Sequence, residues 1–125
     1  KLWDLKKSSL PLCEFQCTND YVLDVQWSPK HPAVFAASDG EGSLQLWNLN
    51  TSTDFPVFRT DVKKKKKEDQ RTCALNCVRW SSDGTNIAAG NSNGSLDVYV
   101  VFLYITVALL SIAQKMFFTL VLINV

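Results

Sequence analysis

This 125-residue chain contains two copies of a similar segment. The sequence "DVQWSPKHPAVFAASDGEGSLQLWNL" occupies residues 24–49, and "CVRWSSDGTNIAAGNSNGSLDVYVV" occupies residues 77–101. Their tryptophans, their central apolar triplets and their "GSL" motifs align in the same order. A shorter third copy, "KLWDL", opens the chain and matches "QLWNL". A repeat at this spacing indicates stacked units of the same local structure, because a single unit cannot bury its hydrophobic face alone.

Each copy is predicted to form β-strands. The segments "VLDVQW" and "LNCVRW" alternate and are rich in β-branched and aromatic residues, as are "SLQLWNL" and "SLDVYVV". "VFAAS" and "NIAAG" are short apolar strands, and "LPLCEFQC" and "FPVFRTDV" complete four-stranded units as outer strands. Helical periodicity is absent from this region. We therefore predict an all-β chain built from four-stranded antiparallel sheets.

Glycine-containing turns separate the predicted strands. Asn93-Gly94 is a strong signal for a two-residue hairpin turn, in which both positions need a positive φ. Glu41-Gly42 stands at the same place in the other copy, and "SSDG" supplies turn residues before "NIAAG".

These residues resemble a WD repeat, with "LWDL" and "LWNL" resembling its closing dipeptide. The resemblance implies an incomplete WD40 β-propeller, because ring closure needs about four to eight blades. Glu41 and Asn93 replace the usual tight-turn aspartate, so the hydrogen-bond network of that turn is expected to be incomplete. We expect structural signature roles for Trp3, Asp4, Trp27, Gly42, Trp47, Asn48, Trp80, Asp83, Gly84, Asn93, Gly94 and Tyr99. The aromatic residues among them are predicted to lie in the core between blades.

The repeats divide the chain into five parts. We expect the end of a blade at 1–18, a complete blade at 19–60, a charged insertion at 61–72, a partial blade at 73–101 and an apolar tail at 102–125. The tail carries a single charge, Lys115. It is interpreted as an aberrant C-terminus, with a membrane span or buried extra strands as the alternatives.

A narrower resemblance connects "NDYVLDVQWSPKHPAVFAASDGEGSLQLWNLN" and "ALNCVRW" with the dynein intermediate chains, especially the cytoplasmic form. It implies a non-catalytic scaffold in the cytoplasm, associated with the cytoskeleton, whose partners are the dynein heavy chain and other dynein subunits. An intraflagellar or axonemal intermediate chain, a generic WD-repeat adaptor and a membrane-tethered WD protein are the alternatives.

Composition and motifs give no support to catalysis or ligand binding. The net charge of +1 provides no global field for nucleic acid. The only histidine, His31, lies in a predicted turn without a partner for acid–base chemistry. Cysteines at i and i+4 of a strand lie too far apart to hold one metal ion, and we expect free thiols, no cofactor and no small-molecule substrate.

The basic run at 61–72 has three interpretations. It is read first as a solvated insertion between blades, because like charges repel and extend a loop. An acidic protein surface or a nuclear-import factor, and a membrane surface, are the other potential partners of this run. The candidate interaction patch consists of Lys63, Lys64, Lys65, Lys66 and Lys67.

Overall fold

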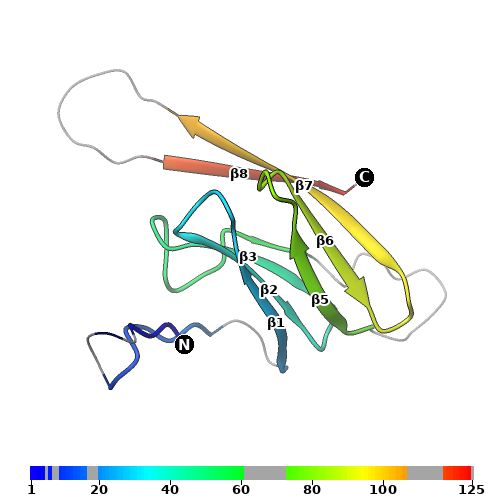
Figure 1. The fold of residues 1–125 in the computed structure, drawn as a ribbon, viewed down its shortest axis with the longest axis horizontal. Helices are drawn as coiled ribbons and strands as arrows, with labels where there is room; N and C mark the ends of the chain where they lie inside the picture. The colour runs from blue at the N-terminus through cyan, green and yellow to red at the C-terminus, as the bar shows by residue number, and fades with distance from the viewer. Residues whose placement is uncertain (5, 7–8, 17–19, 61–72, 107–116, 125) are drawn as a thin grey trace.

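A computed structural model describes residues 1–4, 6, 9–16, 20–60, 73–106 and 117–124, with the backbone alone described for 102–106 and 117–124. These residues form two antiparallel four-stranded sheets, each in the order of the sequence (Figure 1). The first sheet contains β1 (Val22–Trp27), β2 (Val34–Asp39), β3 (Leu44–Asn48) and β4 (Phe58–Arg59). The second contains β5 (Leu75–Trp80), β6 (Asn86–Asn91), β7 (Leu96–Thr106) and β8 (Phe117–Asn124). The predicted all-β architecture is confirmed.

The repeat reappears as an equivalent register in the two sheets. Trp27 pairs with Phe35, and Phe35 with Trp47. At the matching positions, Trp80 pairs with Ile87, and Ile87 with Tyr99. Both first strands also carry an irregularity near their start, between Val22 and Asp24 and between Leu75 and Cys77. Similar sequence therefore gives the same register, because the pleat fixes which side chains share a face.

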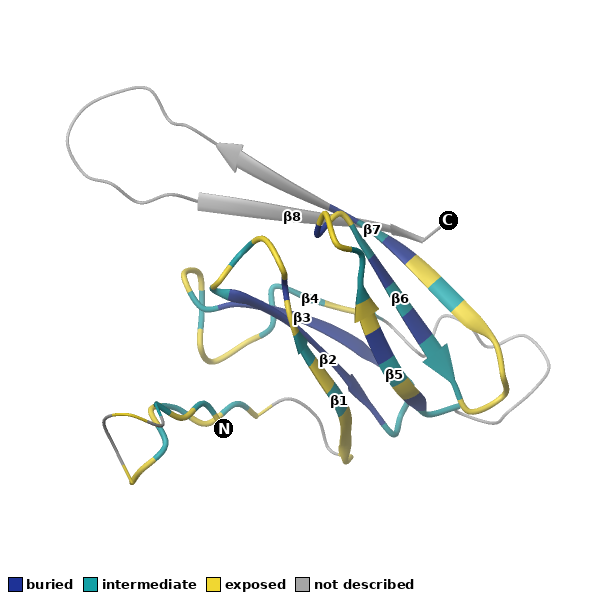
Figure 2. Ribbon diagram, viewed as in Figure 1, coloured by how far each residue is buried: buried dark blue, intermediate teal, exposed yellow. Residues whose placement is uncertain are grey.

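The main core lies between the two sheets. One side of it is formed by Val34, Ala36, Leu44 and Leu46 of the first sheet. The other side is formed by Leu75, Val78, Ile87, Ala89, Tyr99 and Val101. A second cluster, with Phe35 and Trp47 at its centre, lies on the opposite face of the first sheet and contacts Phe15 of the N-terminal segment. Figure 2 shows the result: β2 and β3 are buried on both faces, whereas β1 is largely exposed.

The outer strands are shorter than the sequence predicts. In place of a strand over "LPLCEFQC", a single antiparallel bridge joins Leu2 to Cys13. An isolated pair of short strands is only marginally stable, which accounts for the lack of further pairing among the described residues. In the described part of "FPVFRTDV", the strand that pairs with β3 is limited to Phe58–Arg59. The hydroxyl of Ser52 accepts N–H groups from residues 54 and 55, which holds the preceding segment in a turn.

The β6–β7 hairpin forms, but not through a two-residue turn. Asn91 N–H donates to the Ser95 carbonyl at 3.0 Å, and Gly94 N–H donates to the Asn91 carbonyl at 3.1 Å. The loop therefore has three residues, with a positive φ of 83° at Gly94. Gly42 has the same φ of 83° in the β2–β3 turn. The side chains of Asp39 and Asn91 favour this longer loop, since each accepts the N–H that enters the following strand.

The predicted boundary at residue 101 does not coincide with the end of a strand. β7 continues through Thr106, and eight pairs, from Tyr99–Asn124 to Thr106–Phe117, join it to β8. Of the three interpretations of the tail, strand pairing is the one whose backbone geometry is observed. Among the residues that the structure describes, no helix has the length and apolarity needed to cross a membrane.

Candidate protein-interaction site

The two sheets are joined by side chains on the strands that face each other, β1 and β5. The Asp24 carboxylate accepts the Val78 N–H at 2.9 Å and forms an ion pair with Arg79 at 2.7 Å. Gln26 Oε1 accepts the Trp80 N–H at 2.8 Å, and Trp80 Nε1–H donates to the Gln26 carbonyl at 3.1 Å. The hydrogen bond from Val78, with help from Arg79, holds the pKa of Asp24 below its usual range.

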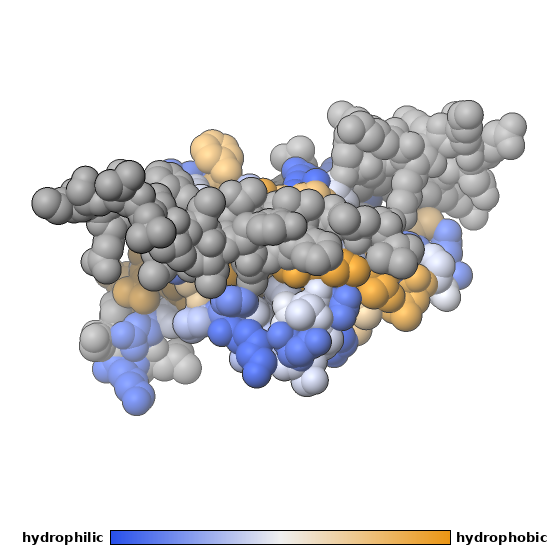
Figure 3. Space-filling view, turned by 90° about the horizontal axis from the view of Figure 1, so that it is seen from above, coloured by the Kyte–Doolittle hydropathy of each residue, from blue (hydrophilic) through white to orange (hydrophobic). Residues whose placement is uncertain are grey.

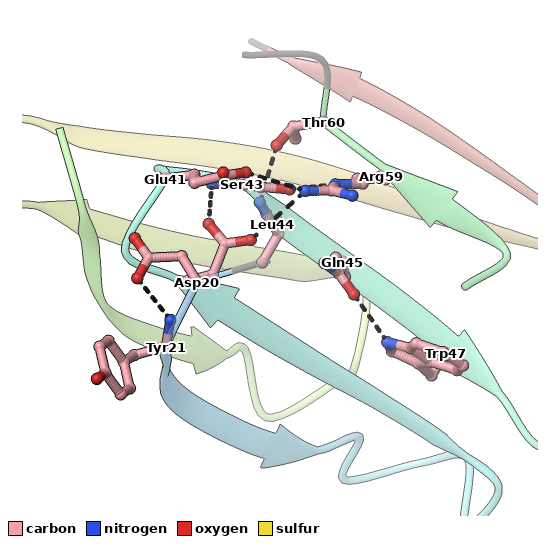
Figure 4. A network of polar contacts seen from close by, with 10 residues as sticks. Asp20, Tyr21, Glu41, Ser43, Leu44, Gln45, Trp47, Arg59 and Thr60 are labelled. Atoms are coloured by element: carbon pink, nitrogen blue, oxygen red, sulfur yellow. Dashed lines mark hydrogen bonds and ion pairs between the residues drawn. The ribbon is translucent and has the colours of Figure 1, made fainter. Parts of the chain in front are cut away.

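A second polar network lies at the end of the first sheet that holds the β2–β3 turn; we call it the polar rim (Figure 4). It consists of Asp20, Asp39, Glu41, Ser43, Arg59 and Thr60. Figure 4 also shows the Tyr21 ring standing away from this network, and this side chain is 82% exposed.

The rim fixes the turn and attaches β4 to it. Asp39 Oδ1 accepts the Ser43 N–H at 2.7 Å, and Arg59 Nε donates to Ser43 Oγ at 3.0 Å. The Arg59 guanidinium also lies 3.4 Å from Glu41 and 3.8 Å from Asp39. Thr60 Oγ1 accepts the Leu44 N–H at 2.8 Å. A turn, a strand end and a fourth strand are thereby held in one arrangement beside the exposed Tyr21.

Burial sets the acidity of Asp39. Its side chain is almost entirely buried, and this desolvation raises its pKa, although the Ser43 N–H and Arg59 act in the opposite direction. Asp39 Oδ2 has no hydrogen-bond partner, and neither does the buried Ser38 Oγ on the same strand. The expectation of an incomplete hydrogen-bond network in this turn stays a prediction.

The predicted signature residues occupy contrasting environments. Trp47 and Tyr99 are buried, and Trp80 packs partly buried against the main core. Trp3 and Trp27 are each nearly half exposed, and their place in a core between blades stays a prediction. Trp27 is exposed because no described sheet packs against β1 on the face of the first sheet that contains Trp27.

The remaining signature residues are found in turns. Asn48 is buried, and its Oδ1 accepts the Asn50 N–H at 3.0 Å. Asp4 Oδ1 accepts the Lys6 N–H at 3.0 Å. Asp83 accepts the Ser81 hydroxyl at 2.5 Å and the Thr85 N–H at 3.0 Å, and these bonds lower its pKa to about 2.

The turn glycines and Asn93 have different neighbours. Asn93 donates to Cys73 Sγ at 2.6 Å. Gly84, with a φ of 70°, packs against the side chains of Lys30 and Ser28. Gly42 lies against the backbone carbonyl of Cys73, whereas open space surrounds Gly94.

Several expectations concern chemistry other than packing. His31 lies in the β1–β2 turn, where its N–H donates to Ser28 Oγ at 3.2 Å. Cys13, Cys73 and Cys77 form no disulfide with one another in the described part of the chain. Within the described ranges, no group of His, Cys, Asp or Glu side chains is placed to hold a metal ion. The candidate patch Lys63–Lys67 lies outside the described residues.

Sequence reasoning missed the residues that connect the repeats. It assigned the turn to Glu41 and Asn93, whereas Asp39 and Asn91 accept the turn N–H groups. Their position in the repeat could have identified them, because Asp39 and Asn91 each end the second strand of their repeat. The bonds of Asp24 and Gln26 to the second sheet, 54 residues further along the chain, have no local signal.

Comparison with known proteins agrees with this geometry. The family described as "WD domain, G-beta repeat" (WD40) matches residues 9–48 and 64–99, together more than half of the chain. The chain belongs to the WD40 repeat family. Its two matched WD40 segments contain β1–β3, complete to Asn48, and β5–β7 as far as Tyr99.

Two dynein subunits are similar to this WD40 chain. The cytoplasmic dynein 1 intermediate chain of Drosophila melanogaster is 46% identical over 101 residues, which are 81% of this chain and 14% of the fly protein. The human cytoplasmic dynein 2 intermediate chain 2 is 33% identical over 90 residues, 71% of this chain and 16% of that protein. The resemblance to dynein intermediate chains is therefore confirmed, and the chain spans about one seventh of these relatives.

Proposed function

We propose that this WD40 chain is part of a non-catalytic scaffold subunit of a dynein motor complex, which binds the motor heavy chain in microtubule-based transport. The observation that carries this proposal is the 46% identity to a cytoplasmic dynein 1 intermediate chain across 81% of the chain. The lower identity of 33% to a dynein 2 intermediate chain favours the dynein 1 class. A cytoplasmic, cytoskeleton-associated location belongs to the same proposal, as does the division into blades, a charged insertion and a tail.

The arrangement of side chains suits a scaffold. The polar groups described above mainly fix turns and join sheets, which produces a rigid surface. A rigid surface binds a partner with little loss of conformational entropy on association. No step of this function requires a reactive group, because motor activity would belong to the heavy chain.

We place a heavy-chain contact at the polar rim. Tyr21 is exposed at the end of the sheet that carries the rim, and tyrosine is enriched at protein interfaces because it combines a large apolar ring with a polar tip. Arg59 is held by Glu41 and by Ser43, so the rim is already ordered before a partner arrives. Phe55 is similarly exposed, but it belongs to the β3–β4 loop at the opposite end of the sheet.

The test is affinity purification of the tagged chain from cells, followed by mass spectrometry of the bound proteins. We expect a dynein heavy chain in near-equal amount with the unmodified chain. Y21A should reduce its recovery, and F55A should leave it unchanged. Recovery of other complexes without a heavy chain would instead favour the generic WD-repeat adaptor.

A further inference from the structure

The turn between β6 and β7 is open, whereas the equivalent turn of the first repeat is packed. Residues 92–96 are exposed, and no described atom lies within 4 Å of the place where a Cβ on Gly94 would stand. In the β2–β3 turn, Gly42 lies against the backbone carbonyl of Cys73, and residues 40–42 are only partly exposed. One position of the repeat therefore has different surroundings in its two copies.

The hydrogen bonds within the two turns are alike. Gly94 N–H donates to the Asn91 carbonyl at 3.1 Å, and Gly42 N–H donates to the Asp39 carbonyl at 3.2 Å. The side chains of Asn91 and Asp39 each accept the N–H of the serine that follows the glycine. Both glycines have a φ of 83°. The two turns therefore differ in packing and not in backbone bonding.

The pair Asn93-Gly94 occurs once in the sequence and has a specific reactivity. Asparagine is thermally labile, because the backbone nitrogen of the next residue can attack its side-chain amide and close a five-membered ring. Glycine in the next position has no side chain to hinder this attack, and its backbone rotates freely enough for ring closure. In the β2–β3 turn the residue before the glycine is Glu41, whose carboxylate resists the same attack.

We propose that Asn93 is a site of spontaneous modification, at which the side-chain amide is lost and an aspartyl or isoaspartyl residue is formed. The backbone nitrogen of Gly94 bonds to Asn93 Cγ, the Cγ–Nδ2 bond breaks, and the amide nitrogen leaves as ammonia with the proton of the attacking nitrogen. Water then opens the cyclic imide. Opening at Cγ gives aspartate, and opening at the backbone carbonyl carbon gives isoaspartate, so no oxidant or reductant is needed. The modification is independent of heavy-chain binding at the polar rim.

The water needed for the second step has access to the loop. Residues 91–95 read "NSNGS", so the loop has no apolar side chain of its own to exclude water. The exposed hydrophobic band that Figure 3 shows belongs to other described residues. The shape of the loop therefore depends on its hydrogen bonds and not on apolar packing within it.

The two products affect these hydrogen bonds differently. Asn93 N–H donates to Asn91 Oδ1 at 3.1 Å, and Asn93 Nδ2 donates to Cys73 Sγ at 2.6 Å. Both products lose the second bond together with Nδ2, but aspartate leaves the backbone of the loop unchanged. Isoaspartate adds one carbon atom to that backbone, within a three-residue loop closed by the bond from Asn91 N–H to the Ser95 carbonyl at 3.0 Å. Isoaspartate should therefore open this end of the hairpin.

The experiment is incubation of the full chain at physiological temperature and mildly alkaline pH, followed by digestion and tandem mass spectrometry. Exchange of the amide for a carboxyl group raises the peptide mass, and fragmentation identifies the residue. We expect the mass gain at Asn93 before any at Asn50 or Asn86, which precede β-branched residues. N93Q, whose attack would need a six-membered ring, should lose the gain, and circular dichroism establishes that it is folded. A gain at Asn50 or Asn86 as fast as at Asn93 would overturn the proposal.

Urea unfolding compares the two products. The isoaspartyl form is separated by chromatography from the incubated chain, and N93D represents the aspartyl form. Loss of about two loop hydrogen bonds should place the urea midpoint of the isoaspartyl form about 0.5 M below that of N93D. Equal midpoints would overturn the structural consequence assigned to isoaspartate.

A matched variant tests whether the surroundings of the turn matter. E41N places an asparagine before Gly42 in the packed β2–β3 turn, and in both turns the glycine is followed by Ser-Leu. In urea that unfolds the chain, the two asparagine–glycine pairs should lose their amides at similar rates. In the folded chain, Asn93 should react about tenfold faster than the pair that E41N creates, which corresponds to a barrier lower by about 1.4 kcal/mol. Equal rates in the folded chain, or a faster reaction at the E41N position, would overturn the proposal.

Discussion

The two turn glycines provide a matched test of how closely the repeats pack. Gly42 and Gly94 occupy equivalent turns with the same φ of 83°, so a Cβ at either position is strained by the left-handed backbone. Only Gly42 lies against a neighbour, the backbone carbonyl of Cys73 that precedes the second sheet. G42A and G94A therefore share the free-energy cost of a left-handed alanine. Only G42A adds a clash with the carbonyl of Cys73.

The expected magnitudes follow from these two costs. A left-handed alanine costs about 1–2 kcal/mol of folding free energy, which is the whole effect expected for G94A. G42A adds a clash with a backbone atom that cannot rotate away, which costs about 1–3 kcal/mol more. We expect a total of about 2–5 kcal/mol for G42A.

Urea unfolding followed by circular dichroism measures the difference. With an m-value of about 2 kcal/mol per molar, a further loss of about 2 kcal/mol places the midpoint of G42A about 1 M below that of G94A. Equal midpoints for the two variants would refute the close approach of the β2–β3 turn to Cys73. A midpoint of G94A equal to that of the unmodified chain would refute the strain argument.

Three further predictions concern single polar groups. S38A removes a buried hydroxyl without a partner and should stabilise the chain by about 1 kcal/mol in the same urea assay; a loss of stability would indicate an unseen partner. D24A leaves the Val78 N–H buried and unpaired, which should cost about 2 kcal/mol, whereas R79A should cost under about 1 kcal/mol because that side chain is exposed; equal losses would contradict the assigned bonds. The Asp83 pKa of about 2 lies below its unfolded value, so its contribution to stability is present above about pH 4 and is lost as pH falls toward 2. D83N should remove this part of the pH dependence, and an NMR titration of Asp83 with an ordinary midpoint would contradict it.

The two sheets could be predicted from the repeat, because equivalent residues take the same side of the pleat in each copy. Once Trp27, Phe35 and Trp47 share a face, the equivalent row in the second sheet follows, and so does the order of strands. The fourth strands were harder to predict, because their pairing depends on turns such as the one that Ser52 holds. Strand propensity alone does not report this competition.

The candidate site was predicted less well for a different reason. The connections of Asp24 and Gln26 to the second sheet arise only when distant segments meet, so residue type gives no warning of them. The exposure of Trp27 was not predictable either, since a repeat position indicates what kind of surface a side chain packs against but not whether that surface is among the described residues. Equivalence between repeats therefore predicts interfaces better than it predicts burial.

Direct binding to a purified dynein heavy chain tests the proposed function most directly. The chain would be immobilised and titrated with the heavy chain by biolayer interferometry, with Y21A and F55A measured alongside. The account predicts saturable binding at a one-to-one ratio, weakened by Y21A and unchanged by F55A. A folded chain that shows no saturable binding at any heavy-chain concentration tested would contradict it.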